Sequence, residues 1–466
     1  MTRRPRILIH IEDPRRDGSV LLALYELFRR AGARPFLSTR RTTELLLKSL
    51  PFEAVLVAGP ENISYDLIPQ VVKRTRIFML PTEGAIFDEG PLMIKYGGGE
   101  DKAKWERHIE TTSRFFLWGE DSRRVLQKTG RFPDEKLVVA GAPRMDFFLT
   151  RPSQEETAAA AAENRIGIVS SFILINSIVR VPMIHNIEGN RKINWASQST
   201  KRHYEDRVWT EAACFRVLLD LIEECQHRKQ PLWVRAHFQE SMENWRWFKD
   251  RFPDTLYFGQ DHLPFESWLT QVRAVAGFNS TTFFEAVAAG KPAVNLVKLV
   301  GPRLDEHTDR HPQAYYPILD QVESPEDWDQ MFDFLDQVGR MQPGEPFEHS
   351  AQARSIVQEV CNFPRPVSAL ARVVQTVLSD LGEAPISSTA DPLREGVALA
   401  KAKALDAYTF NVRRDPAGNC WFPLHARQLR NRFRKEIARY LRGALAFPWI
   451  EEAGSRPKAP LEKILQ

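Results

Sequence analysis

The clearest candidate for chemistry is a run of four polar residues after an apolar segment that ends at Phe278. The four are Asn279, Ser280, Thr281 and Thr282. An alanine-rich segment follows, and Gly290 would end it, so the pattern indicates a strand, a turn and a helix. A helix that starts after a parallel strand offers backbone N–H groups and a positive dipole end to an anion. The sequence therefore predicts a phosphate-binding turn at 279–282.

Glu285 lies about one turn into that predicted helix, and its carboxylate has two interpretations. In the first, it accepts hydrogen bonds from two ribose hydroxyls of a nucleotide. In the second, Thr282 and Glu285 form a capping box, a Thr-x-x-Glu pattern whose side chains bond the helix start. These residues alone leave both interpretations open.

A second group of candidates is acidic and follows the predicted strand that ends at Leu80. Residues 81–90 contain three carboxylates, those of Glu83, Asp88 and Glu89. A carboxylate at the carboxyl end of a strand can act as a general base or a nucleophile. We expect Glu83 to be the catalytic residue because it follows the strand most closely, and Gly84 would allow a sharp turn beside it. Glu89 is the second candidate, and a solvated, glycine-rich loop is the alternative.

Arg235 and His237 follow each other at the end of another predicted strand, with one residue between them. Both side chains can therefore face the same edge. His237 would donate a hydrogen bond to a phosphate, and Arg235 would neutralise its charge. The alternatives are a structural histidine and a structural ion pair.

Strand-like and helix-like segments alternate along most of the chain, which predicts an α/β fold with doubly wound parallel sheets. In such sheets, ligands bind outside the carboxyl ends of the strands. The strands expected in the first half are 6–11, 35–39, 54–58, 77–80, 115–118 and 137–140. Those expected in the second half are 172–176, 232–236, 256–258, 272–278 and 293–297.

The domain boundaries follow from polar segments. A polar, Ala/Glu-rich linker at 150–165 separates an expected first domain, 1–150, from a second, 166–382. Within the second domain, residues 180–203 read as a long polar loop. A Pro/Ser-rich segment then leads to a basic helical tail, 393–466.

Residues 424–446 of this tail predict a basic amphipathic helix. In one interpretation its apolar side packs on the body of the protein and its basic side faces water. In the other, it docks on an anionic membrane surface.

Composition excludes several classes of protein. The net charge of the 466 residues is +4, too small to argue for a nucleic-acid partner. No apolar run approaches the ~20 residues that span a bilayer. The four cysteines show no paired spacing, so we expect neither a metal site nor a disulfide framework. A reducing cytosol fits this cysteine usage.

Taken together, the motifs resemble those of bacterial surface-carbohydrate biosynthesis proteins over roughly residues 5–300. Residues 233–237, WVRAH, resemble an "RPHP" element, with Ala236 and Phe238 in place of the prolines. Residues 277–285, GFNSTTFFE, resemble a serine/threonine phosphate turn with a ribose-binding glutamate. The "WG…GxPRxD" pair has its counterparts in the segments FLWG, 116–119, and GAPRMD, 141–146. The segment PTEG, 81–84, resembles an acidic loop of the first domain.

The resemblance is nearest to CMP-Kdo-dependent transferases of capsule and lipopolysaccharide synthesis, and more distant to CDP-glycerol glycerophosphotransferases. It implies a GT-B glycosyltransferase, with two Rossmann-like domains facing a cleft and a helical C-terminal extension. The segment Asp88-Glu89-Gly90 also resembles an acidic signature of bacterial sialyltransferases and related transferases.

The expected reaction moves a sugar from a CMP-linked, Kdo-like donor to a glycan or lipid-linked acceptor, without a metal or other cofactor. The donor would bind at Arg235, His237, 279–282 and Glu285. The expected location is the cytoplasm, extending to the inner face of the cytoplasmic membrane. The alternatives are a CDP-polyol phosphotransferase, a nucleotide-sugar epimerase, or a non-catalytic subunit of a polysaccharide assembly complex.

Overall fold

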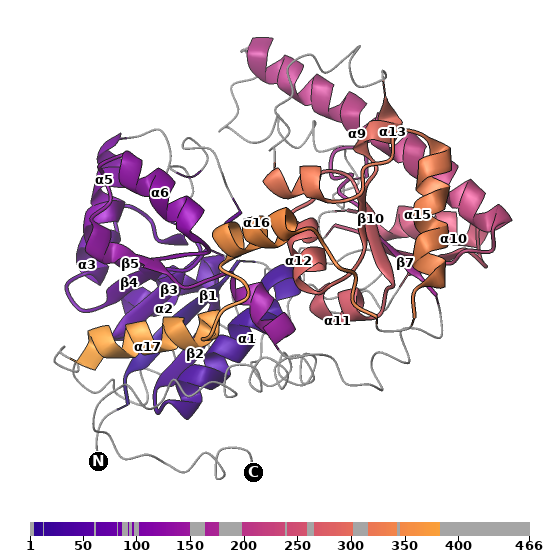
Figure 1. Cartoon of the computed structure of the whole chain (residues 1–466). Coiled ribbons are helices and arrows are strands. Elements are labelled where there is room, and N and C mark those ends of the chain that lie inside the picture. Colours follow the sequence, from indigo (N-terminus) through magenta and orange to yellow (C-terminus); the bar gives the residue numbers. More distant parts are fainter. Residues whose placement is uncertain are drawn as a thin grey trace. The chain divides into compact units, whose positions relative to one another are not determined.

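The chain forms two compact units, each built around its own parallel sheet (Figure 1). The first unit contains Met1–Thr150 and Gln358–Gln466, and the second contains Arg151–Val357. The computed structural model describes residues 4–12, 14–59, 62–81, 83–85, 92, 96, 102–149, 164–176, 198–237, 240–258, 265–301, 316–342 and 345–382. The predicted α/β class with two parallel sheets is confirmed.

The sheet of the first unit has the strand order β2-β1-β3-β4-β5-β6, and all its described pairings are parallel. The strands are β1 (Arg6–Ile11), β2 (Arg34–Thr39), β3 (Ala54–Val57), β4 (Arg76–Met79), β5 (Thr112–Leu117) and β6 (Leu137–Val139). Ile9 in β1, an interior strand, pairs with Leu37 on one side and Leu56 on the other. This position explains why β1 is fully buried and mainly aliphatic, with Arg6 and His10 as its polar residues.

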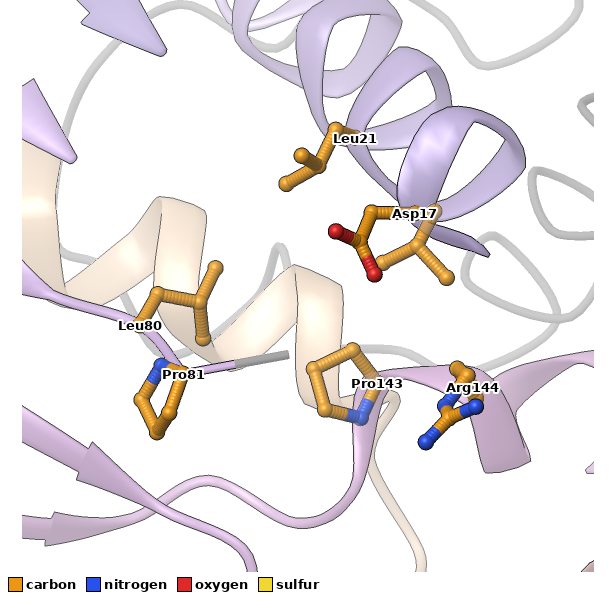
Figure 2. Close-up of a pocket in the computed structure, with 7 residues that line it drawn as sticks. Asp17, Leu21, Leu80, Pro81, Pro143 and Arg144 are labelled. Carbon is orange, nitrogen blue, oxygen red and sulfur yellow. The ribbon is translucent and has the colours of Figure 1, made fainter. Parts of the chain in front are cut away.

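Helices cover both faces of this sheet. They are α1 (Pro14–Arg30), α2 (Arg40–Ser49), α3 (Ile68–Val71), α5 (Lys102–Thr111), α6 (Glu120–Lys128) and α17 (Ala369–Gly382), with short 3-10 turns η2 (Asp134–Lys136) and η3 (Pro143–Leu149). Ile7 and Ile9 pack in one core with α1 and α17, whereas Leu8 points to the opposite core with α2. A small pocket opens where α1 meets the segments that follow β4 and β6 (Figure 2).

The last described helix, α17, belongs to the first unit, which corrects the expected second domain of 166–382. The Asp146 carboxylate, fully buried, accepts hydrogen bonds from the backbone N–H groups of Ala369 and Leu370, both at 2.9 Å. It also accepts a hydrogen bond from Ser368 at 2.8 Å and forms an ion pair with Arg365. Asp146 thus caps α17 from a distant part of the chain. Local alternation of strands and helices cannot show which core a late helix joins.

Glycines in the segments FLWG and GAPRMD let residues 359–365, which lead into α17, approach the first sheet closely. A Cβ atom on Gly119 would lie 1.9 Å from the carbonyl oxygen of Glu359. Gly141 has a φ of 100°, and a Cβ there would lie 2.8 Å from the guanidinium group of Arg365. Both glycines are therefore required by the packing of residues 359–365.

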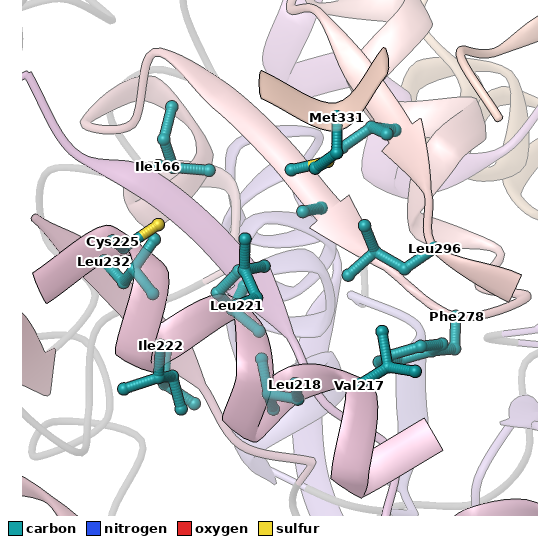
Figure 3. Packing of buried hydrophobic residues seen from close by; sticks show 14 of the residues in the cluster. Ile166, Val217, Leu218, Leu221, Ile222, Cys225, Leu232, Phe278, Leu296 and Met331 are labelled. Atoms are coloured by element: carbon teal, nitrogen blue, oxygen red, sulfur yellow. The ribbon is translucent and has the colours of Figure 1, made fainter. Parts of the chain in front are cut away.

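The second unit has the strand order β11-β10-β7-β8-β9, again with parallel pairings. The strands are β7 (Ile166–Val169), β8 (Leu232–Arg235), β9 (Leu256–Phe258), β10 (Ala274–Gly277) and β11 (Ala293–Asn295). The helical elements are α9 (Gln198–His227), α10 (Met242–Arg251), α11 (Phe265–Thr270), α12 (Thr282–Ala288), α13 (Val297–Val300), η4 (Pro317–Gln321) and α15 (Trp328–Arg340). The next helix, α16 (Ala351–Cys361), begins in the sequence of the second unit and ends in that of the first. Ile166, Leu221 and Met331 meet in a core of strand and helix side chains (Figure 3).

The strand expected at 172–176 is wrong. The first strand of this sheet is β7, and residues 173–175 form a turn after it. Gly167 weakens the strand signal of β7, yet a side chain there would collide with Trp268, whose ring lies 2.6 Å from the position of a Cβ. Phe172 and Leu174 are buried, so their apolar side chains reflect burial in the core and do not indicate a strand.

The loop expected at 180–203 is shorter than predicted, because α9 already begins at Gln198. Residues 150–163 of the expected linker and 180–197 of the expected loop lie outside the described residues, as does the whole tail with its helix at 424–446.

We predict that Asp146→Asn will loosen α17. The substitution leaves the buried Arg365 without a charged partner, a change that typically costs about 3–5 kcal/mol. Hydrogen exchange of residues 369–382 and the unfolding temperature measure the effect.

Asp380→Asn is the matched control, because Asp380 also ties α17 to the first unit, through Arg114 at 2.8 Å. This pair is partly exposed, at 29% and 13% of the side chains, so about 1 kcal/mol or less is expected. Equal protection of α17 in both variants would contradict the role given to Asp146.

Candidate functional site

The strand order of the second sheet creates a switch point beside β7. The chain passes from β7 to β8 on one side, whereas β10 lies on the other side. Ligands of doubly wound sheets bind at the carboxyl ends of the strands, where the order reverses. Ser170 follows β7, Arg235 ends β8, and the segment 278–281 follows β10. The predicted donor-binding residues therefore lie on the strand ends on either side of β7.

Asparagine side chains fix the turn after β10. Asn279 has a φ of 40°, in the left-handed region that asparagine tolerates better than most residues. Its backbone N–H donates to Oδ1 of Asn295 at 3.3 Å, and Nδ2 of Asn295 donates back to Oδ1 of Asn279 at 3.4 Å. Asn295, the last residue of β11, was not among the predicted site residues. The sequence feature that could have indicated Asn295 is an amide side chain at the end of an apolar strand.

The capping-box interpretation of Thr282 and Glu285 is wrong. Helix α12 begins at Thr282 and has Thr281 at its N-cap, so Thr282 cannot be the capping residue. The backbone N–H of Thr282 instead donates to Oγ of Ser280 at 3.2 Å. Glu285 is 4% exposed and lies one turn into the helix. Its predicted contact with ribose hydroxyls stays a prediction.

Arg235 and His237, at the end of β8 and just after it, have different surroundings. The guanidinium carbon of Arg235 lies 5.4 Å from the ring centre of Phe265 and 6.0 Å from that of Trp268, which stabilises the cation by cation–π interactions. The backbone N–H of His237 donates to Oε1 of Glu240 at 3.1 Å. Both residues are half-buried, so the structure anchors each of them at the edge of the sheet.

Glu240, which the sequence reasoning missed, holds this edge together. It is 1% exposed, and burial raises the pKa of its carboxyl group, while the hydrogen bonds it accepts oppose that shift. The donors are Ser170 Oγ at 2.8 Å, Phe172 N at 3.0 Å, Asn176 Nδ2 at 3.2 Å, His237 N at 3.1 Å and Trp245 Nε1 at 2.9 Å. One carboxylate therefore joins the segment after β7 to the segment after β8.

A second buried carboxylate binds the same segment from α9. Glu211 accepts hydrogen bonds from the backbone N–H groups of Leu174 at 2.7 Å and Ile175 at 3.2 Å. Burial raises the pKa of Glu211 to about 7, against the lowering effect of these bonds and of Arg207. The charge of Glu240 nearby raises the pKa further.

In the first unit, the pocket collects residues from three different strand ends. Asp17 comes from the first turn of α1, Pro81 from the segment after β4, and Arg144 from η3 after β6 (Figure 2). Asp17 is 1% exposed and was not predicted as a site residue. An acidic residue in the first turn of the helix after β1 was the only sequence signal for it.

Glu83 lies two residues beyond Pro81 and is exposed. The next residue, Gly84, is required by Trp118, because a Cβ on Gly84 would lie 2.4 Å from Cγ of that ring. Nε1 of Trp118 donates to the carbonyl oxygen of Pro81 at 3.2 Å. The segment before and after Glu83 is thus held in place, but for a different reason than the sharp turn expected. Glu89 lies outside the described residues.

Among the residues that the structure describes, no three His, Cys, Asp or Glu side chains gather closely enough to hold a metal ion. Of the helices that the structure describes, none is long and apolar enough to cross a membrane.

No protein-family model and no curated protein matches the sequence. Solved structures do match. A histidine variant of the wall teichoic acid polymerase TagF superimposes with a TM-score of 0.52 and 9% identity, over 82% of this chain and 89% of that one. A TagF structure soaked with CDPG gives 0.50 and 9%, over 81% and 89%. The S. aureus MnaA–UDP structure gives 0.49 and 10%, over 83% and 100%.

The chain has the GT-B fold. Two Rossmann-like units, each with a parallel sheet covered by helices, agree with the TagF superposition. The sequence-based prediction of this fold is confirmed. At 9% identity, what the two proteins are shown to share is the fold alone.

We predict that Glu211 makes the stability of the second unit depend on pH. Its folded pKa of about 7 lies above the ordinary 4.5. The folded state therefore binds the proton more tightly, and the stabilisation is complete below about pH 4.5 and lost as the pH rises through 7. The shift corresponds to about 3 kcal/mol at most.

Glu211→Gln should flatten this dependence between pH 4.5 and 7, measured as the unfolding temperature and as hydrogen exchange of residues 172–176. Glu223→Gln, an exposed acid on the same helix, is the control and should follow the unmodified protein. An unchanged pH slope in Glu211→Gln would refute the assignment.

Proposed function

We propose that this protein is a GT-B glycosyltransferase of surface polysaccharide synthesis, which takes a sugar from a CMP-linked, Kdo-like donor. The observation that carries the proposal is the gathering of the phosphate turn, Arg235 and His237 at the switch point of the second sheet. The GT-B fold and the resemblance of these segments to surface-carbohydrate transferases support it.

Each part of the donor has a matching group in this proposal. The hydroxyls of Ser280 and Thr281 bind the phosphate, in a turn whose shape Asn279 and Asn295 maintain. Arg235 and His237 neutralise the charge that grows on the departing nucleotide. Glu285 binds the ribose hydroxyls. With a cation, a histidine and hydroxyls available, this leaving group needs no metal or other cofactor.

The proposed reaction exchanges one bond for another. The bond between the anomeric carbon and the phosphate oxygen breaks, and CMP leaves with the electron pair. An acceptor hydroxyl of a glycan or lipid-linked chain bonds to that carbon and gives its proton to a carboxylate. Glu83 is our first candidate for this base and Glu89 the second.

A CDP-polyol phosphotransferase is the second candidate, favoured by the TagF superposition. One of those TagF structures was soaked with CDPG, and its TM-score of 0.50 shows a shared fold. In this reaction the acceptor hydroxyl attacks the phosphorus next to the polyol, and CMP leaves again. The two candidates differ in what the acceptor gains, a sugar or a polyol phosphate.

Calorimetric titration with CMP, CDP and UDP tests the nucleotide, and the mass added to the acceptor tests the reaction. Tighter binding of cytidine than of uridine nucleotides supports the proposal. Preference for UDP would favour an epimerase, and failure to bind any nucleotide would favour a non-catalytic assembly subunit. Either result would overturn the proposed function.

The proposed location is the cytoplasm, extending to the inner face of the cytoplasmic membrane. The basic helix at 424–446 and a lipid-linked acceptor are the reasons for it. That helix lies outside the described residues, so its docking on anionic lipid stays a prediction from the sequence.

We predict that the double variant Ser280→Ala, Thr281→Ala will weaken nucleotide binding by about 1–3 kcal/mol, the scale of lost hydrogen bonds to a charged group. Titration calorimetry measures it. Ser324→Ala, a hydroxyl on another segment whose Oγ bonds only a nearby carbonyl among the described contacts, is the control. If the double variant binds nucleotide as tightly as the unmodified protein, this turn does not bind the phosphate.

We predict that Glu83→Gln will bind nucleotide normally and lose transfer. Removing a positioned general base costs about 10²–10⁴-fold in rate. A coupled assay of CMP release measures turnover, and Glu110→Gln, another exposed acid of the first unit, is the control. If Glu83→Gln stays active while Glu89→Gln is dead, the base is Glu89. If both stay active, the acidic loop has no catalytic role.

A further inference from the structure

The amino edge of the first sheet carries a row of arginines. Strands β2, β1 and β4 each begin with an arginine, namely Arg34, Arg6 and Arg76. Arg6 pairs with Arg34 in the register of β1 and β2, and Ala54 of β3 pairs with Arg76. Because β3 lies between β1 and β4, the row extends over four neighbouring strands, about 15 Å at the ordinary strand spacing.

The chain that leads from α2 into β3 joins this row to further cations. The guanidinium group of Arg74 donates a hydrogen bond to the carbonyl oxygen of Leu47, and Lys48 is the next residue. The backbone N–H of Arg76 donates to the carbonyl oxygen of Glu53 at 2.9 Å. Side chains of both signs are thus brought to one place, and its cations define what is called the basic face below. They are Arg6, Lys48, Lys73, Arg74 and Arg76.

The carboxylates beside the basic face are fewer than its cations. Glu53 is 6% exposed and accepts a hydrogen bond from the backbone N–H of Arg6 at 2.6 Å. Glu44 forms an ion pair with Lys48 at 3.7 Å, and the lysine side chain is still 58% exposed. These two acids do not neutralise five cations, so the face keeps a net positive charge.

An apolar side chain is exposed on the same face. Val72 directly follows α3 and precedes Lys73. It is 37% exposed, the most exposed large apolar side chain among the described residues of the first unit. Positive charges spread along a sheet edge suit an extended anionic surface, and an apolar side chain among them suits the boundary between lipid headgroups and acyl chains.

Cations at this edge also have an ordinary structural explanation, which covers only part of the pattern. Helix α2 ends there, and the negative end of a helix dipole attracts a basic residue such as Lys48. Parallel strands have little net dipole, so the same reason does not apply to arginines that begin strands. The row at the starts of β2, β1 and β4 is therefore the part that calls for a partner.

We propose that the basic face docks the first unit on an anionic lipid bilayer, with Lys48 and Lys73 among the headgroups and Val72 at the acyl boundary. The carboxyl edge of this sheet lies at the opposite ends of the strands, so docking leaves it open to a ligand. The inference rests neither on the proposed function nor on the helix predicted at 424–446.

Co-sedimentation of the full chain with vesicles of two parts phosphatidylcholine and one part phosphatidylglycerol tests the docking. The double variant Lys48→Gln, Lys73→Gln should bind these vesicles about 25-fold more weakly, since each cation near an anionic leaflet contributes about fivefold, or about 1 kcal/mol. Raised salt should weaken binding of the unmodified protein, and vesicles of phosphatidylcholine alone should bind it far less.

The double variant Lys249→Gln, Arg340→Gln is the matched control. Both residues are exposed cations of the second unit, so the net charge changes equally. This control should bind the vesicles as the unmodified protein does. The inference is overturned if the unmodified protein does not bind, if Lys48→Gln, Lys73→Gln binds as tightly, or if binding falls equally in the control.

Val72→Ser is a second test, which also serves if the double variant fails to fold. It should weaken vesicle binding about threefold by removing apolar surface. It should leave the binding of inorganic polyphosphate, a soluble polyanion, unchanged. Polyphosphate binding that depends on Lys48 and Lys73, without binding to vesicles, would overturn the docking and assign the face to a soluble polyanion.

Titration of CMP and CDP on the same samples separates this inference from the proposed function. The variant Lys48→Gln, Lys73→Gln should keep the nucleotide affinity of the unmodified protein within about twofold, because the candidate nucleotide residues belong to the second unit. A protein that docks through the basic face but binds no nucleotide keeps the docking and loses the proposed reaction. A protein that binds cytidine nucleotides, and binds vesicles independently of these lysines, loses the docking alone.

Discussion

Backbone N–H groups that no strand or helix satisfies need hydrogen-bond partners, and buried carboxylates supply them in both units of this protein. Such groups occur in the first turn of a helix and in a segment that leaves a strand without entering a helix. Asp146 meets this need at the start of α17, and Glu240 meets it after β7 and β8. Glu211 adds two further bonds to the segment after β7. The position of α17 and the edge of the second sheet depend on these acids.

These buried acids lie close in the sequence to candidate binding residues. Glu240 and Asp146 point inward and are occupied by donors of the protein itself. Arg235 and His237 lie three to five positions before Glu240, and Arg144 lies two positions before Asp146. Structural acids and candidate binding residues therefore occur within a few positions of one another. Residue type alone does not separate them, since only the count of internal donors shows that Glu240 is saturated.

The sequence was sufficient for the class of fold because alternation of apolar and helical segments is a local property. It also placed most strands, and it located the turn after β10 from its cluster of polar residues. It failed where the outcome depends on distant contacts. Gly167 is a poor strand residue that Trp268 requires, so β7 was missed. The partner of α17 is Asp146, more than 200 positions earlier, and no local pattern indicates it.

In the candidate site, too, residues marked by a local pattern were predicted, and residues that depend on distant contacts were missed. Arg235, His237 and 279–282 were found because each directly ends or follows an apolar strand. Glu240 and Asn295 were missed because their importance lies in bonds to other segments. Asp17 was missed because the pocket it enters forms only when three strand ends meet. Glu83 was found from its position, but the exposure of its side chain could not be read from the sequence.

The motifs behind the family resemblance differ in what they do. The glycines of WG and GAPRMD admit residues 359–365, and Asp146 caps α17. These residues serve the packing of the first unit, so sharing them is an argument for a shared fold, as the TagF superposition at 9% identity also is. Donor chemistry must instead be argued from Arg235, His237 and the turn after β10. There the prolines of the related motif are replaced by Ala236 and Phe238. Proline restricts the backbone and lacks an N–H group, so Ala236 restricts this edge less than the proline of the related motif would. The GT-B fold is therefore established by the structure, whereas the donor stays a proposal.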